Sequence, residues 1–408
     1  MTFTGEFPSL RSIADVLRTT TEGLARELAQ QTDTPPDWTD VEWRIAMAVA
    51  SMHGVSSLLK TSLRWEGPPA WQTFLTSQRF HTCNRHERIM QLKSHLDAEA
   101  RCAGIPVVAL KGAALYGIGV YECGDRPMAD LDILIRPQDR EPAFSMLARL
   151  GYSLSYTTPR HWVFLPSDRG SCESLGEHSD NLIPIEVHAS TTEWLPIAPI
   201  DISEALWTMS PQPGLNPYPS VAALMRHVLH HAAGAACFRG LRLLHLQDIA
   251  RLSARMHGED WRWILSSCDD QSAWWVFPPL LLTARYFGGI PAAVLDLAES
   301  NCHRRLRRAC RDWRISDVSL SALWIRAFPG IEWCSSLPEV FRYASQRIRP
   351  PRRVIDARRS LAQDTTQLAG SGWAHLSQTR RIARWIRSRP PRVETIRTVS
   401  AAWQATAD

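Results

Sequence analysis

Two short apolar segments and the charged residues beside them constrain the fold of this chain more than any other feature. Residues 107–110 lead into Lys111-Gly112, and Leu131–Ile135 begins beside Asp130 and includes Asp132. Apolar runs of this length, rich in Val, Ile and Leu, are typical of buried strands. Because alternate side chains of a strand share a face, Asp130 and Asp132 are expected on one face, about 7 Å apart.

A pair of acids on one strand face favours divalent metal binding. Mg²⁺ prefers a few carboxylates together with phosphate oxygens and water. Two ions about 3.5–4 Å apart can neutralise a polyphosphate while an attacking oxygen is held in line. Asp130 and Asp132 are therefore predicted to bind Mg²⁺ (or Mn²⁺). Glu186, in the alternating segment 183–189, is predicted to complete the metal site, and all three acids are predicted to be catalytic.

The cationic residues near these segments predict a nucleotide-binding site. Lys111 is one of only three lysines among 46 basic residues. Gly112 would let backbone N–H groups approach a ligand at the turn, and Arg126 would hold phosphates from the other side. His188 shares a strand face with Glu186. It either assists the acceptor, by orienting it or acting as a base, or is a structural partner of the neighbouring acid.

The segments along the chain predict an α+β protein, in which a small mixed-sheet domain is flanked by helical segments. Helices are expected over residues 39–60, 70–102, 113–118, 141–150, 221–233, 241–256, 261–268 and 276–287, and additional strands over 152–156 and 162–165. The predicted units are a weakly structured N-terminus (1–38), a helical lead-in (39–103), a catalytic domain (104–200), a helical domain (201–300) and an Arg-rich helical region (301–408). Asp248 is expected to join the helix pair by a buried polar contact to His230 or His231.

Composition excludes several classes of protein. The nine cysteines form no CxxC pair, which favours a reduced protein without structural zinc, and a cytoplasmic location is expected. No N-terminal signal and no membrane span is predicted. Residues 301–408 carry 21 Arg against 8 acidic residues, but they lack an RNA-binding signature, so nucleic acid is not the expected partner.

The order of these motifs resembles that of the uncharacterised nucleotidyltransferase family, within the DNA polymerase beta-like superfamily. The matching segments are 104–112, 126–132 and 185–188, with helical segments at 50–55, 84–85, 246–252, 260–261 and 284–288. The similarity covers about residues 40–300. Two departures are the Lys111-Gly112 turn, where the superfamily usually has Gly-Ser, and Glu186, where the family more often has Asp.

This resemblance implies Mg²⁺-dependent transfer of a nucleotidyl group from an NTP donor to a hydroxyl or phosphate of an acceptor. The acceptor would be a small molecule, glycan or peptide, in a bacterial biosynthetic pathway for polysaccharides or modified peptides. Two alternatives remain open. An Asp-x-Asp metal site also serves nucleotide-sugar-dependent glycosyltransferases, and a non-catalytic nucleotide-binding scaffold could retain the same fold.

Overall fold

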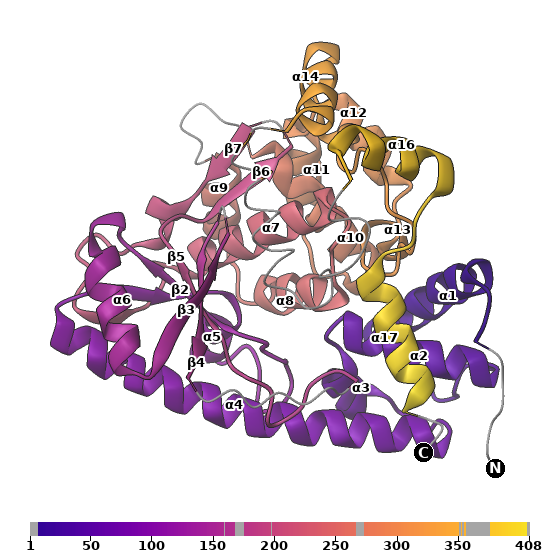
Figure 1. The fold of residues 1–408 in the computed structure, drawn as a ribbon, viewed down its shortest axis with the longest axis horizontal. Helices are drawn as coiled ribbons and strands as arrows, with labels where there is room; N and C mark the ends of the chain where they lie inside the picture. Colours follow the sequence, from indigo (N-terminus) through magenta and orange to yellow (C-terminus); the bar gives the residue numbers. More distant parts are fainter. Residues whose placement is uncertain are drawn as a thin grey trace.

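A mixed sheet lies at one end of the molecule, and helices occupy most of the rest (Figure 1). This computed structural model describes residues 7–158, 160–167, 175–196, 198–266, 273–350, 352, 355 and 376–405. The α+β class predicted from the sequence is confirmed.

The described residues form a six-stranded sheet in the order β3-β4-β5-β2-β1-β8 and a two-stranded sheet of β6 and β7. The strands are β1 (Pro106–Ala109), β2 (Leu131–Ile135), β3 (Tyr152–Thr157), β4 (Trp162–Pro166), β5 (Ile185–His188), β6 (Thr192–Leu195), β7 (Ala198–Asp201) and β8 (Gly214–Asn216). In the centre, β2 is antiparallel to β1 and parallel to β5, and β4 is antiparallel to β5. The sequence predicts β1 to β5 within a few residues, but β6, β7 and β8 were not predicted.

The helices before and within the sheet are α1 (Leu10–Ala29), α2 (Asp40–Met52), α3 (Ser56–Ser62), α4 (Pro69–Ala103), α5 (Lys111–Gly117) and α6 (Arg140–Arg149). Those after it are α7 (Val221–Cys237), α8 (Leu243–Ser253), α9 (Gly258–Ser266), α10 (Phe277–Phe287), α11 (Ala292–Asn301), α12 (Arg304–Arg311), α13 (Ile315–Val318), α14 (Leu337–Ile348), α16 (Gln378–Ser388) and α17 (Val393–Gln404). The last two residues of the predicted helix 261–268 lie outside the described residues.

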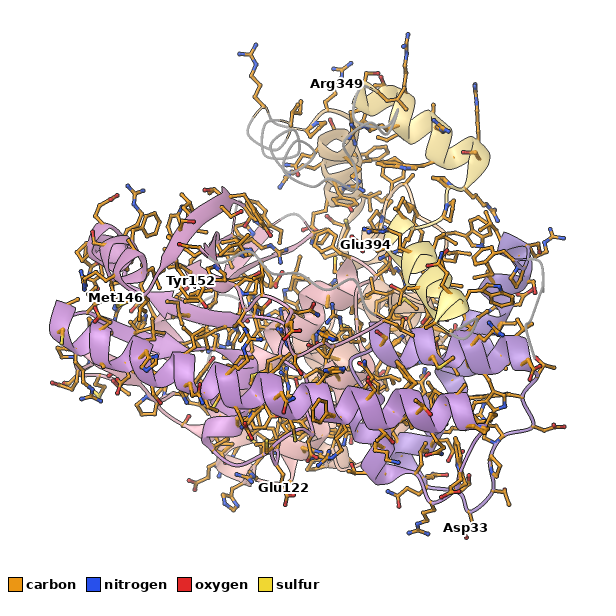
Figure 2. The ribbon with its side chains drawn as sticks, turned by 60° about the horizontal axis from the view of Figure 1, so that its bottom comes forward. Asp33, Glu122, Met146, Tyr152, Arg349 and Glu394 are labelled. Carbon is orange, nitrogen blue, oxygen red and sulfur yellow. The ribbon has the colours of Figure 1, made fainter. Side chains whose placement is uncertain are left out.

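The long helix α4 joins the sheet to the helical part of the molecule. It extends along the lower side of the molecule in Figure 1 and crosses the front in Figure 2, with Met146 of α6 and Tyr152 of β3 towards one end and Asp33 towards the other. Its buried residues include Ile89 and Leu96, which face the core beneath the sheet. The helix ends at Gly104, whose left-handed backbone (φ +69°) turns the chain into β1.

Two predictions about the N-terminal half of the helical part are wrong. The N-terminus was expected to be weakly structured, but α1 is a helix because Ile13, Leu17 and Leu24 share one face and are fully buried. The single helix expected over residues 39–60 is divided between α2 and α3 at Gly54. Its φ of +67° breaks the helical path, and a Cβ added there would lie only 3.1 Å from Cδ2 of Leu244.

The helical segments share one hydrophobic core. This cluster of buried side chains takes residues from α1 and α2, from α7, α8 and α10, and from α17 near the C-terminus. A second cluster lies between the sheet, α4 and α6. The boundaries predicted for the five units remain predictions. Within the described part of the chain, the structure contains no helix with the length and apolarity needed to cross a membrane.

Candidate active site

The register between β2 and β5 brings the predicted acids together. Asp132 on β2 pairs directly with Glu186 on the parallel strand β5. Asp130 immediately precedes β2, and all three carboxylates line one cavity of about 400 Å³. The opposite face of the same strands is apolar, because Ile133 and Ile185 are completely buried beneath the sheet. The alternation predicted from sequence therefore directs these acids away from the core.

Asp132 is the most enclosed of the three acids, with an exposed fraction of 6%. Its Oδ1 accepts a hydrogen bond of 2.9 Å from Nζ of Lys111. The same oxygen lies 2.9 Å from Nε2 of His188. Although burial alone would raise the pKa of Asp132, these two neighbours lower it well below its usual range. Asp132 is thus held as a charged acceptor at the centre of the site.

The other two acids have the opposite electrostatic behaviour. Burial and the negative charge of Asp132 raise the pKa of Asp130 to about 6 and that of Glu186 to about 8. Crowded carboxyl groups retain protons because neighbouring negative charges repel each other. A divalent cation relieves the same repulsion, so this set of oxygen donors fits Mg²⁺ or Mn²⁺.

Lys111 reaches Asp132 from an unusual turn between β1 and α5. Its backbone is in the left-handed region, with a φ of +46°, which is rare for a residue other than glycine. The following Gly112 packs against the guanidinium of Arg126, where an added Cβ would collide with Nη1. Close packing against Arg126 therefore favours glycine at position 112. On sequence grounds, glycine is favoured there for a different reason, which is the approach of a ligand to the backbone N–H groups.

Arg126 lines the cavity but is anchored by Asp248 of α8. Its Nε and Nη2 donate hydrogen bonds of 2.9 Å to Oδ1 and Oδ2 of Asp248, and Tyr121 donates a third to Oδ1 at 2.7 Å. The predicted contact between Asp248 and His230 or His231 is therefore wrong. Nε2 of His230 instead contacts the backbone carbonyl of Ile200 at 3.0 Å, and Nδ1 of His231 lies 3.6 Å from Oε1 of Glu193.

Several residues that the sequence argument missed complete the cavity wall. They are Arg160, His161, Glu193, His227, Arg242 and His245. Arg160 forms an ion pair of 2.9 Å with Glu193, whose carboxylate packs on Gly234 in the middle of α7. A glycine inside a helix was the available signal, since it commonly marks a close approach by another group. Among the described residues, no carboxylate lies within 4.0 Å of the guanidinium of Arg242.

The pairing of β4 with β5 brings His161 next to Glu186 and His188. The antiparallel register Trp162 to Val187, extended by one residue, places His161 opposite His188. Their ring centroids are 4.9 Å apart. The order of β4 and β5 in the sheet determines this contact, and nothing local to His161 predicts it.

Comparisons with known proteins agree with this arrangement of motifs. Residues 39–288 match the protein family described as uncharacterised nucleotidyltransferase. Comparison with curated proteins and with solved structures finds no match. The matched segment contains β1, β2, β5 and every residue that lines the cavity. Since this segment is more than half of the chain, the protein belongs to the uncharacterised nucleotidyltransferase family.

Proposed function

We propose that this protein transfers a nucleotidyl group from an NTP to a hydroxyl or phosphate of an acceptor and releases pyrophosphate. The observation that carries the proposal is the convergence of Asp130, Asp132 and Glu186 on one wall of a cavity, beside Lys111. The family match supports the same class of reaction. A glycan, a peptide or a small biosynthetic intermediate is the proposed acceptor.

In this proposal, Asp130, Asp132 and Glu186 hold Mg²⁺ or Mn²⁺, which would neutralise the triphosphate and the charge that develops at the α-phosphorus. Lys111 binds the phosphates, and Gly112 and Arg126 form the wall against which they lie. The acceptor oxygen forms a bond to the α-phosphorus while the bond to the pyrophosphate oxygen breaks. Glu186 accepts the proton of an acceptor hydroxyl. His188 orients the neighbouring Asp132 through its contact of 2.9 Å.

The thermal stability of the protein, measured with each NTP and with several nucleotide sugars, tests the donor. A ligand that binds only the folded state stabilises it by about 2.7 kcal/mol at 100 times its dissociation constant. We expect a Mg²⁺-dependent increase in Tm with at least one NTP. Asp130→Ala and Asp132→Ala should abolish it. Asp139→Asn, beyond the other end of β2 and outside the cavity, should retain it.

Two results would redirect the proposal. An increase in Tm with a nucleotide sugar alone would indicate a glycosyltransferase. An increase with an NTP without release of pyrophosphate in the presence of candidate acceptors would indicate a nucleotide-binding scaffold.

A further inference from the structure

Two histidines adjoin the proposed Mg²⁺ ligands and supply a different kind of donor. His161, Glu186 and His188 each offer a ligand atom, and these atoms all lie within 4.8 Å of one another. Nε2 of His161 is 3.4 Å from Oε2 of Glu186, and Nε2 of His188 is 3.9 Å from the same oxygen. Oδ1 of Asp132 lies 2.9 Å from Nε2 of His188.

The two separations from Glu186 suit a shared metal ion. Ligand bonds of about 2.0–2.1 Å in a tetrahedral site place neighbouring donor atoms about 3.3–3.4 Å apart. The distance between His161 and Glu186 already has this value, and the distance from His188 requires a shift of only about half an ångström. On binding the ion, Nε2 of His188 would exchange its hydrogen bond to Asp132 for a bond to the metal, and the ring proton would be on Nδ1.

The backbone around His161 fixes this residue in place. Oγ1 of Thr158 accepts hydrogen bonds from the backbone N–H groups of Arg160 and His161, at 3.1 and 3.0 Å, and donates one to the carbonyl of His161 at 3.1 Å. His188 and Glu186 belong to β5, in the interior of the sheet. A side-chain site built on such elements needs little reorganisation to bind an ion.

The identity of the donors selects the class of ion. Imidazole is a ligand of Zn²⁺, Fe²⁺ and similar transition ions, whereas Mg²⁺ prefers oxygen donors. Two histidines with one carboxylate form a three-residue set that leaves a coordination position for water or substrate, which is typical of catalytic rather than structural zinc sites. All three residues line the cavity, so this position would be open to a bound substrate.

We infer that His161, Glu186 and His188 form a binding site for a divalent transition ion of the Zn²⁺ class. The site lies beside the proposed Mg²⁺ position and shares Glu186 with it, and Asp132 remains the ion-pair partner of Lys111. The role of this ion in catalysis rests on the proposed function, because it would polarise a phosphate or acceptor oxygen. Binding of the ion itself requires no nucleotide.

The experiment is a titration of the full chain with Co²⁺ in the absence of nucleotide, followed by visible absorption. Competition between Zn²⁺ and a chromophoric chelator then gives the Zn²⁺ dissociation constant. We expect one Co²⁺ per chain, with visible bands of a nitrogen and oxygen site and without the intense near-ultraviolet band of cysteine ligands. His161→Ala should weaken binding at least tenfold. The matched control His95→Ala, an exposed histidine on α4, should not change it.

His161 is half-buried at the end of a hairpin, so His161→Ala is the main test, and far-ultraviolet circular dichroism verifies its fold. His188→Asn, at a buried position, should give the same loss. Absence of saturable binding, or binding that both variants leave unchanged, would overturn the inference. Mg²⁺-dependent NTP binding without Co²⁺ binding would overturn this inference alone. Co²⁺ binding that depends on His161, without any NTP binding, would overturn the proposed function alone.

Discussion

The guanidinium of Arg126 is joined to the carboxylate of Asp248 by two parallel hydrogen bonds of 2.9 Å, and both side chains are buried. This pair attaches the segment before Asp130 to α8, so it couples the six-stranded sheet to the helical core. The sequence suggested a phosphate-binding role for Arg126. In the structure, Arg126 also holds the segment before β2 against α8 through Asp248. Substitution of Asp248 tests this second role.

Asp248→Asn should lower the free energy of unfolding by about 3–5 kcal/mol, because it leaves the charge of Arg126 buried without its partner. The double variant Arg126→Met/Asp248→Leu should lose much less than the two single changes together. Urea unfolding of the wild type, Asp248→Asn, Arg126→Met, Asp248→Leu and the double variant measures both quantities. A loss below about 1 kcal/mol in Asp248→Asn would contradict the structural role of the pair.

Gly112→Ala should destabilise the protein by about 1–3 kcal/mol, since the new methyl group collides with the guanidinium of Arg126. Gly258→Ala is the matched control. Gly258 begins α9 and has no atom within 4 Å of an added Cβ. Alanine should therefore leave stability unchanged or raise it slightly there. Equal effects of the two changes on the urea midpoint would show that close packing does not require Gly112.

Stability should fall in mild acid, partly because of His53. This side chain is completely buried, accepts a hydrogen bond from the backbone of Leu243 and contacts Ser321, and burial lowers its pKa to about 3. The unfolded state binds a proton below about pH 6.5 and the folded state does not, so stability is retained above that pH and lost as the pH falls towards 3. The contribution lost between pH 6.5 and 5 is about 2 kcal/mol.

Urea unfolding at pH 7 and pH 5 measures this loss for the wild type, His53→Asn and His95→Ala. The fall in stability should be about 2 kcal/mol smaller in His53→Asn than in the wild type, and unchanged in His95→Ala, which alters an exposed histidine. The same fall in all three proteins would show that His53 does not contribute to the pH dependence.

The sequence predicts single strands and helix ends well, because each depends on the side-chain pattern of a few neighbouring residues. Alternation of apolar and acidic residues predicts β2 and β5, and the capping box of Thr39 and Glu42 begins α2 as expected. In α1, Ile13, Leu17 and Leu24 are buried at helical spacing, although no helix is predicted there from the sequence.

Contacts between distant segments could not be predicted in the same way. His161 enters the site only because β4 lies next to β5, and Asp248 binds Arg126 because α8 packs against the loop before β2. In both cases the chain offers several partners of suitable charge, and only the arrangement of the elements selects one. The roles of Asp130, Asp132, Glu186, Lys111 and Arg126 in catalysis remain predictions.

Lys111→Met should weaken NTP binding and also change Asp132, whose charge Lys111 stabilises through a hydrogen bond of 2.9 Å. We expect at least a tenfold increase in the NTP dissociation constant, which corresponds to a loss of about 1.4 kcal/mol. Lys60→Met, in α3 and outside the cavity, is the control and should bind NTP as the wild type does. Unchanged affinity in Lys111→Met would remove this residue from the proposed phosphate site.

In the proposed site, Asp130, Asp132 and Glu186 together hold the metal that binds the NTP. Calorimetric titration of the preferred NTP, with Mg²⁺ and with chelator, tests this in the wild type, Asp132→Asn and Asp139→Asn. We expect Mg²⁺-dependent binding that Asp132→Asn weakens at least tenfold and Asp139→Asn leaves unchanged. Equal affinities in all three proteins, or affinity independent of Mg²⁺, would contradict it.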